Sequence, residues 1–81
     1  MKIKVLLFAS FRETAGLSQG TLEVEPGATL GDVWATLVAE HPRLAPHSGT
    51  AAYAINGTYA RPAERVSEGD EVAFLPPVSG G

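Results

Sequence analysis

The sequence predicts one small α+β domain in which a sheet of four to five strands packs on one helix. The chain has 81 residues, which is room for a single hydrophobic core. Residues 29–42 repeat apolar side chains at helical spacing, whereas residues 2–9 and 71–77 have the apolar, alternating pattern of strands. A sheet with an apolar helix on one face is a two-layer α+β arrangement.

The first predicted strand is "KIKVLLFA", residues 2–9. Its odd positions up to residue 7 are uniformly apolar, while its even positions change from Lys2 and Lys4 to Leu6 and Phe8. Successive side chains of a strand point to opposite faces of the sheet. One face of this strand is therefore apolar throughout, and the other becomes apolar halfway along.

A loop and a second strand are expected next. Residues 10–20, "SFRETAGLSQG", predict a loop because two glycines punctuate them. The alternating "TLEVE" of residues 21–25 predicts a strand that ends at Pro26-Gly27, a pair that favours a turn. The chain should thus begin as a strand, loop, strand hairpin.

The strongest helical signal lies in residues 29–42, "TLGDVWATLVAEHP". Thr29 is a favourable N-cap, Asp32 adds negative charge to the first turn, and Pro42 ends the helix. Five apolar side chains fall on one helical face: Leu30, Val33, Trp34, Leu37 and Val38. This stripe is expected to supply much of the core.

The last third of the chain predicts a loop, two turns and short strands. Residues 43–50 have the composition of a loop, and Asn56-Gly57 between two apolar segments predicts a tight hairpin. A second turn at residues 68–70 precedes the final strand, "EVAFLPP". Pro76 has no amide hydrogen, so strand pairing should end before it.

The sheet face turned away from the helix is expected to carry an apolar patch. By alternation Leu6, Phe8, Ala73 and Leu75 share this face if the first and last strands are neighbours, and Tyr59 could join them. An exposed patch of this kind marks a partner surface. The alternative is that loops or a second copy of the chain cover these residues.

The chain ends in "PPVSGG". Two prolines keep the exit from the sheet extended, and glycine has no Cβ, which keeps the terminus slim. A terminal carboxyl has an ordinary pKa of about 3.3–3.7 and is an anion at neutral pH. We expect a domain at residues 1–75 followed by an extended, flexible tail at residues 76–81 that offers its carboxylate; the alternative is a frayed end without function.

Composition argues against several classes of protein. The formal net charge of −3 lacks the basic footprint of a nucleic-acid binder. The first apolar run, residues 5–9, is far shorter than the roughly 18 residues of a membrane-spanning helix. Cysteine is absent, which excludes disulfides and thiolate metal sites and favours a reducing, cytoplasmic location.

The sequence also lacks the equipment of a self-sufficient enzyme. No phosphate-binding glycine loop and no nucleophile elbow are present. His41 and His47 make a poor zinc site, and the acidic residues 68, 70 and 71 are typical turn and surface charges, so no metal site is expected. Any chemistry at the terminus must be performed by a partner protein.

Three segments resemble one known family. "KVLLFASFRETAG", "AINGTYA" and "GDEVAFLPPVSGG" are similar to the small, sulfur-carrying subunits of molybdopterin synthase, which have a ubiquitin-like β-grasp fold with a mixed sheet. The resemblance covers essentially the whole chain, and the C-terminal motif is its specific part.

The resemblance implies a sulfur-carrier chemistry at Gly81. An ATP-dependent adenylating enzyme, similar to those that activate ubiquitin, would adenylate the carboxylate, which would then become a thiocarboxylate. The tail would enter the large synthase subunit and give its sulfur to a cyclic pyranopterin precursor. The chain itself would bind no cofactor, since ATP and sulfur come through the activating partner. The residues that would insert are Pro76, Pro77, Val78, Ser79 and Gly80.

The resemblance also implies a partner surface with Leu75 on it and polar contacts from Arg12. Family members often carry an aromatic residue where this chain has Leu75, so packing against the partner would differ in detail. Three alternatives stay open: a sulfur carrier for thiamine thiazole synthesis or transfer-RNA thiolation, a ubiquitin-like modifier joined to lysines, and an interaction module with an inert tail.

Overall fold

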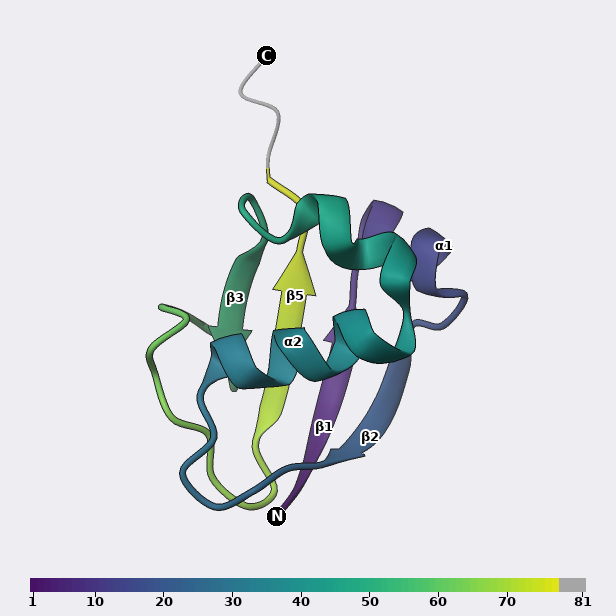
Figure 1. The fold of residues 1–81 in the computed structure, drawn as a ribbon. Helices are drawn as coiled ribbons and strands as arrows, with labels where there is room; N and C mark the ends of the chain where they lie inside the picture. The colour runs from purple at the N-terminus through teal and green to yellow at the C-terminus, as the bar shows by residue number, and fades with distance from the viewer. Residues whose placement is uncertain (78–81) are drawn as a thin grey trace.

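The computed structural model describes residues 1–77 and confirms the α+β prediction. Within these residues five strands form one mixed sheet in the order β2-β1-β5-β3-β4, with β1 and β5 parallel and the other neighbours antiparallel. Figure 1 shows helix α2 crossing one face of this sheet. The bounds are β1 Lys2–Leu7, α1 Ala9–Ala15, β2 Gln19–Glu23, α2 Leu30–Glu40, a 3-10 helix Pro42–His47, β3 Ala52–Ile55, β4 Thr58–Ala60 and β5 Glu71–Leu75.

Helix α2 begins where its cap was predicted. The Asp32 N–H donates to Thr29 Oγ1 at 3.1 Å, and the Thr29 N–H donates to Asp32 Oδ2 at 3.0 Å, which forms a reciprocal capping box. Two carbonyls of the loop at residues 61–67 accept the N–H groups of Leu30 and Gly31. The first turn of the helix is thereby satisfied by its own cap and by the chain that leads to β5.

The core lies between α2 and the sheet. The odd positions of β1 and the positions of Val72 and Phe74 on β5 are almost completely buried under the helix. Of the predicted helical stripe, Val38 is only partly buried. The buried members are Leu30, Val33, Trp34 and Leu37. Alternation along β1 and β5 and helical spacing in α2 therefore predicted this part of the core, apart from Val38.

Trp34 joins the layers of the fold. Its ring centroid lies 5.4 Å from that of Phe11, 5.3 Å from Phe74 and 6.2 Å from Tyr53. Its indole N–H donates to Ser48 Oγ at 2.9 Å, so the polar edge of the ring has a partner. One side chain thus holds α1, two strands and the segment after the 3-10 helix together.

The predicted loop at residues 10–20 is wrong over its first half, because helix α1 spans residues 9–15. Phe11 is fully buried against Trp34, and Gly16 ends the helix with φ +79 while its N–H donates to the Arg12 carbonyl. A helix of seven residues is marginal on its own. Burial of Phe11 against another element stabilises it, and local sequence could not predict that contact.

The predicted loop at residues 43–50 is also partly wrong. A 3-10 helix covers residues 42–47 and buries Leu44 completely beside α2. The second strand starts at Gln19, two residues earlier than predicted, because β1 pairs with it from Leu6 onward. Tertiary packing decided both boundaries.

Both predicted turns are confirmed, and one side chain links them. Asn56 and Gly57 have φ of +49 and +85, as a tight hairpin requires, and Gly69 has φ +83. The Asn56 amide donates to Asp70 Oδ1 at 3.0 Å and its Oδ1 accepts the Glu71 N–H at 2.9 Å. The hairpin of β3 and β4 is therefore tied to the start of β5.

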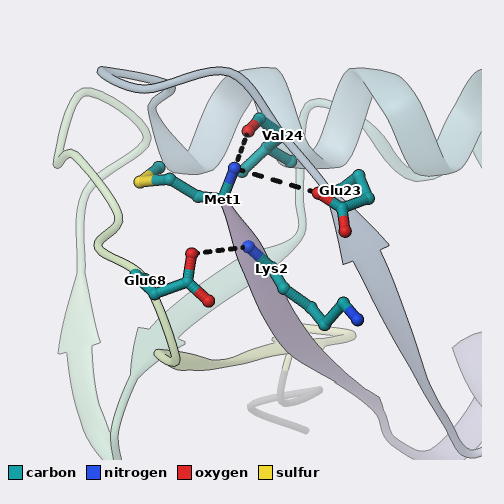
Figure 2. A network of polar contacts seen from close by, with 5 residues as sticks. All are labelled: Met1, Lys2, Glu23, Val24 and Glu68. Atoms are coloured by element: carbon teal, nitrogen blue, oxygen red, sulfur yellow. Dashed lines mark hydrogen bonds and ion pairs between the residues drawn. The ribbon is translucent and has the colours of Figure 1, made fainter.

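Polar contacts fasten the start of β1 (Figure 2). The Met1 amino group donates to the Val24 carbonyl at 2.7 Å and lies 3.9 Å from a Glu23 carboxylate oxygen. The Lys2 N–H donates to Glu68 Oε1 at 3.0 Å. This end of the sheet is opposite to the end where β5 stops (Figure 1). Over residues 1–77 no helix has the length and hydrophobicity needed to cross a membrane.

Trp34→Ala is expected to lower the free energy of unfolding by about 3–5 kcal/mol, because it removes a buried ring that packs against three others. Denaturant unfolding followed by circular dichroism measures this loss. Trp34→Phe is the matched control: it keeps an aromatic ring and should cost roughly 1–2 kcal/mol. A loss below about 1 kcal/mol for Trp34→Ala would contradict its place in the core.

Tyr53 is expected to make stability fall at alkaline pH. Burial raises the pKa of its phenol above the ordinary 10.0, so the unfolded chain loses this proton first. The contribution of the buried, protonated Tyr53 phenol to the free energy of unfolding is complete below about pH 10. It is lost as pH rises through the raised pKa. Unfolding of Tyr53→Phe at pH about 9 and about 11 should show a smaller fall than the parent. Tyr59→Phe, which changes an exposed ring, is the control; equal falls in parent and Tyr53→Phe would contradict the prediction.

Candidate functional site

The outer face of the sheet, turned away from α2, carries one row of matched side chains. Strand register places Gln19 beside Leu6, Leu6 beside Ala73, Ala73 beside Ala54 and Ala54 beside Tyr59. Residues paired across neighbouring strands lie on the same face. The expectation that the first and last strands bring their apolar outer residues together is therefore confirmed.

Apart from Gln19, this row forms part of an apolar hollow of about 300 Å³. Its small members are Ala54, Gly57 and Ala73, and its larger members are Leu6, Phe8, Tyr59 and Leu75, with Glu71 completing the lining. Side chains as small as alanine and glycine leave space between the larger ones. We call these eight residues the outer hollow.

The outer hollow is open to solvent. Phe8 is 42% exposed and Tyr59 is 73% exposed, and they are the large apolar residues that stay exposed within residues 1–77. Leu6 and Leu75 are half-buried. No loop of the described chain covers the patch. The alternative that loops of this chain cover these residues therefore does not apply to residues 1–77. Apolar exposure at one place favours a contact with another molecule.

The charged side chains of the outer face lie mainly at the end of the sheet away from the outer hollow. The Lys4 Nζ is 3.7 Å from a Glu71 carboxylate oxygen, and both side chains are about half exposed, so the ion pair stabilises the fold little. A larger hollow of about 510 Å³ lies beyond it, and Lys2, Lys4 and Glu68 bring charged side chains to its lining. The outer face thus has an apolar half and a charged half, with Glu71 at the border between them.

The apolar half adjoins the C-terminal segment. Leu75 is the last residue of β5 and lines the outer hollow, and Pro76 follows it directly. Pro76 and Pro77 belong to no helix or strand. The other predicted tail residues, 78–81, lie outside the described residues, so the roles predicted for them stay predictions.

Arg12 does not line the outer hollow. It lies exposed on α1, and its carbonyl serves the C-terminal cap of that helix. Its predicted role in polar contacts with a partner stays a prediction. The other four predicted surface residues, Leu6, Phe8, Tyr59 and Leu75, are brought together by the fold.

Three lining residues were not predicted for this surface: Ala54, Gly57 and Glu71. The Asn56-Gly57 turn contained a usable signal, because a two-residue hairpin loop places residue 54 opposite residue 59. Pairing of β3 with β5, which brings Ala54 beside Ala73, joins distant parts of the chain and has no local signal.

The described residues form an exposed apolar hollow without a cluster of buried ionisable groups beside it. Among residues 1–77 no polar or charged side chain is buried, and no three acidic or histidine side chains gather as a metal site would require. Tyr53, whose pKa is raised by burial, lies on the face of the sheet that packs on α2. A surface of this kind is suited to docking.

Comparison with known proteins identifies similar chains over the whole length. The model of the ThiS family matches residues 5–81. A molybdopterin synthase sulfur carrier subunit of Chlamydomonas reinhardtii is 45% identical and both chains are fully covered. Small archaeal modifier protein 1 of Haloferax volcanii is 39% identical over 93% of this chain and 95% of its own. A crystal structure of SAMP1 from the same organism has a TM-score of 0.85 at 34% identity, with both chains fully covered.

Proposed function

The chain belongs to the ThiS family, and on that premise we propose that it is the sulfur carrier subunit of a molybdopterin synthase. The observation that carries the proposal is the position of the outer hollow, which ends at Leu75 where the C-terminal segment begins. The full-length similarity to a sulfur carrier subunit supports the same function. The fold is the ubiquitin-like β-grasp that this function uses.

The hollow and the tail have separate tasks in this proposal. Apolar side chains of the large synthase subunit would fill the hollow, and the same face would dock the ATP-dependent adenylating enzyme in the cytoplasm. Docking at Leu75 would leave Pro76 and Pro77 to direct the chain away from the sheet. Six residues reach at most about 20 Å, so the partner's reaction centre must lie within that distance of the hollow.

The proposed chemistry takes place at the Gly81 carboxylate. One carboxylate oxygen attacks the α-phosphorus of ATP, pyrophosphate leaves, and the terminus becomes an acyl adenylate. Hydrosulfide supplied through the activating partner then attacks the acyl carbon and displaces AMP, which yields the thiocarboxylate after loss of one proton. Glycine at positions 80 and 81 lets the partner approach the reacting carbon closely, because no Cβ is present.

A second candidate function is protein modification. The similarity to small archaeal modifier protein 1, in sequence and in structure, favours it. The modifier would use the same activated terminus, but a lysine amine of a target would displace AMP. Sulfur carriers for thiamine thiazole or transfer-RNA thiolation share the activation step and differ in the acceptor.

Loss of Gly81 is expected to abolish function and leave the fold intact. Intact-protein mass spectrometry of the parent from cells should show a fraction with one terminal oxygen replaced by sulfur, and the chain without Gly81 should show none. One glycine added after Gly81 should also abolish maturation of molybdenum enzymes. The melting temperature is the control and should not change.

The outcomes separate the candidates. A ladder of conjugates linked through Gly81, with no sulfur-bearing fraction, would favour the modifier. Full maturation of molybdenum enzymes in cells that hold only the chain without Gly81 would contradict the carrier function.

Leu75→Asp is expected to weaken binding to the large subunit by about 2–4 kcal/mol, because it places a charge in an apolar contact. Isothermal titration calorimetry with the purified large subunit measures this change. Ala63→Asp is the matched control: it adds the same charge to an exposed loop residue that does not line the outer hollow. Equal affinities of Leu75→Asp and Ala63→Asp would remove the hollow from the interface.

A further inference from the structure

Two locally unfavourable features, a backbone conformation and an N-cap residue, lie next to each other at the rim of the outer hollow. Ala9 has φ +50, a left-handed conformation that a Cβ disfavours, although the residue is not glycine. The residue before it, Phe8, is the N-cap of α1 and makes no side-chain capping bond. Ser, Thr, Asp and Asn are the favoured N-caps. Neither residue is buried, so core packing does not explain the choice of either.

We call the left-handed backbone at Ala9 the joint. It lies between two aromatic residues, Phe8 and Phe11, whose rings are on opposite faces of the sheet. Phe8 keeps an extended backbone, with φ −118 and ψ 153, and its N–H still donates to the Phe74 carbonyl at 3.3 Å. Its own carbonyl accepts the Phe11 N–H at 3.1 Å in the first turn of α1. Three residues after exposed Phe8, the ring of Phe11 is fully buried. The chain changes direction between them, at Ala9.

We propose that the left-handed backbone at Ala9 is a positioning device that holds the Phe8 ring at the outer hollow for partner docking. Strained residues persist where the surrounding structure over-determines them, and they gather at functional surfaces. Here Phe8 is fixed on one side by β5 and Phe11 on the other by Trp34. Ala9 acts through Phe8 and touches no partner in this proposal, which rests on the proposed function for the identity of that partner.

Stability of the free protein tests the strain. Ala9→Gly should raise the melting temperature by about 4 °C, because glycine adopts positive φ without a Cβ penalty. Ala39→Gly is the matched control at an exposed alanine of α2, and it should lower the melting temperature. A lower melting temperature for Ala9→Gly would overturn the strained joint.

Binding to the purified large subunit tests the positioning. Ala9→Val opposes positive φ and should weaken binding by about tenfold, whereas Ala9→Gly should bind within about twofold of the parent. In a Phe8→Ala background, Ala9→Val should change the affinity by less than about twofold, because there is no ring left to position. An equal loss in both backgrounds, or no loss in either, would overturn the proposal. Ala39→Val is the control for the added methyl groups.

A measurement on the free protein keeps this inference separate from the proposed function. Nuclear Overhauser contacts between the Phe8 ring and the side chain of Leu75, which follows the Leu7–Phe74 pair in the register of β1 and β5, should be present in the parent and in Ala9→Gly and be lost in Ala9→Val. Their persistence in Ala9→Val would overturn the joint whatever the partner is. If Phe8→Ala itself binds the large subunit as tightly as the parent, the docking function of the hollow fails. The nuclear Overhauser contacts then decide by themselves whether the backbone at Ala9 positions the Phe8 ring.

Discussion

The parallel pairing of β1 with β5 is the constraint on which the rest of the structure depends. It joins the two ends of the described chain, with Val5 beside Val72 and Leu7 beside Phe74. These pairs lie under α2 and form the centre of the core. Because side chains alternate, the same pairing places Leu6 beside Ala73 on the other face. One register therefore creates both the core and the outer hollow.

The outer face combines two kinds of surface at the two ends of the sheet. At the end where β1 starts, charged side chains face the solvent, and the contacts of the Met1 amino group fasten the start of the strand. At the end where β5 stops, small residues beneath larger apolar ones leave a hollow in contact with water. Exposed apolar area adds nothing to the stability of the isolated domain. Its place beside the C-terminal segment is understandable if a partner covers it.

Helix α1 shows how a weak local signal becomes a fixed element. Its sequence has neither a favoured N-cap side chain nor the length for independent stability. Phe11 packs against Trp34 from α2, and Gly16 closes the helix, so contacts with a distant segment overcome poor local preference. The same contacts hold the backbone at Ala9 in its unfavourable conformation.

The sequence by itself determined the α+β class, the bounds of α2 near Thr29 and Pro42, the Asn56-Gly57 turn and the parity of the strands, because these depend on local spacing and side-chain type. It also identified five residues of the outer hollow, on the condition that β1 and β5 are neighbours. Only the tertiary structure decided that condition, the helix at residues 9–15 and the place of Ala54 beside Ala73. The physical reason is that each of these rests on contacts between residues far apart in the chain, whose free energy no local pattern records.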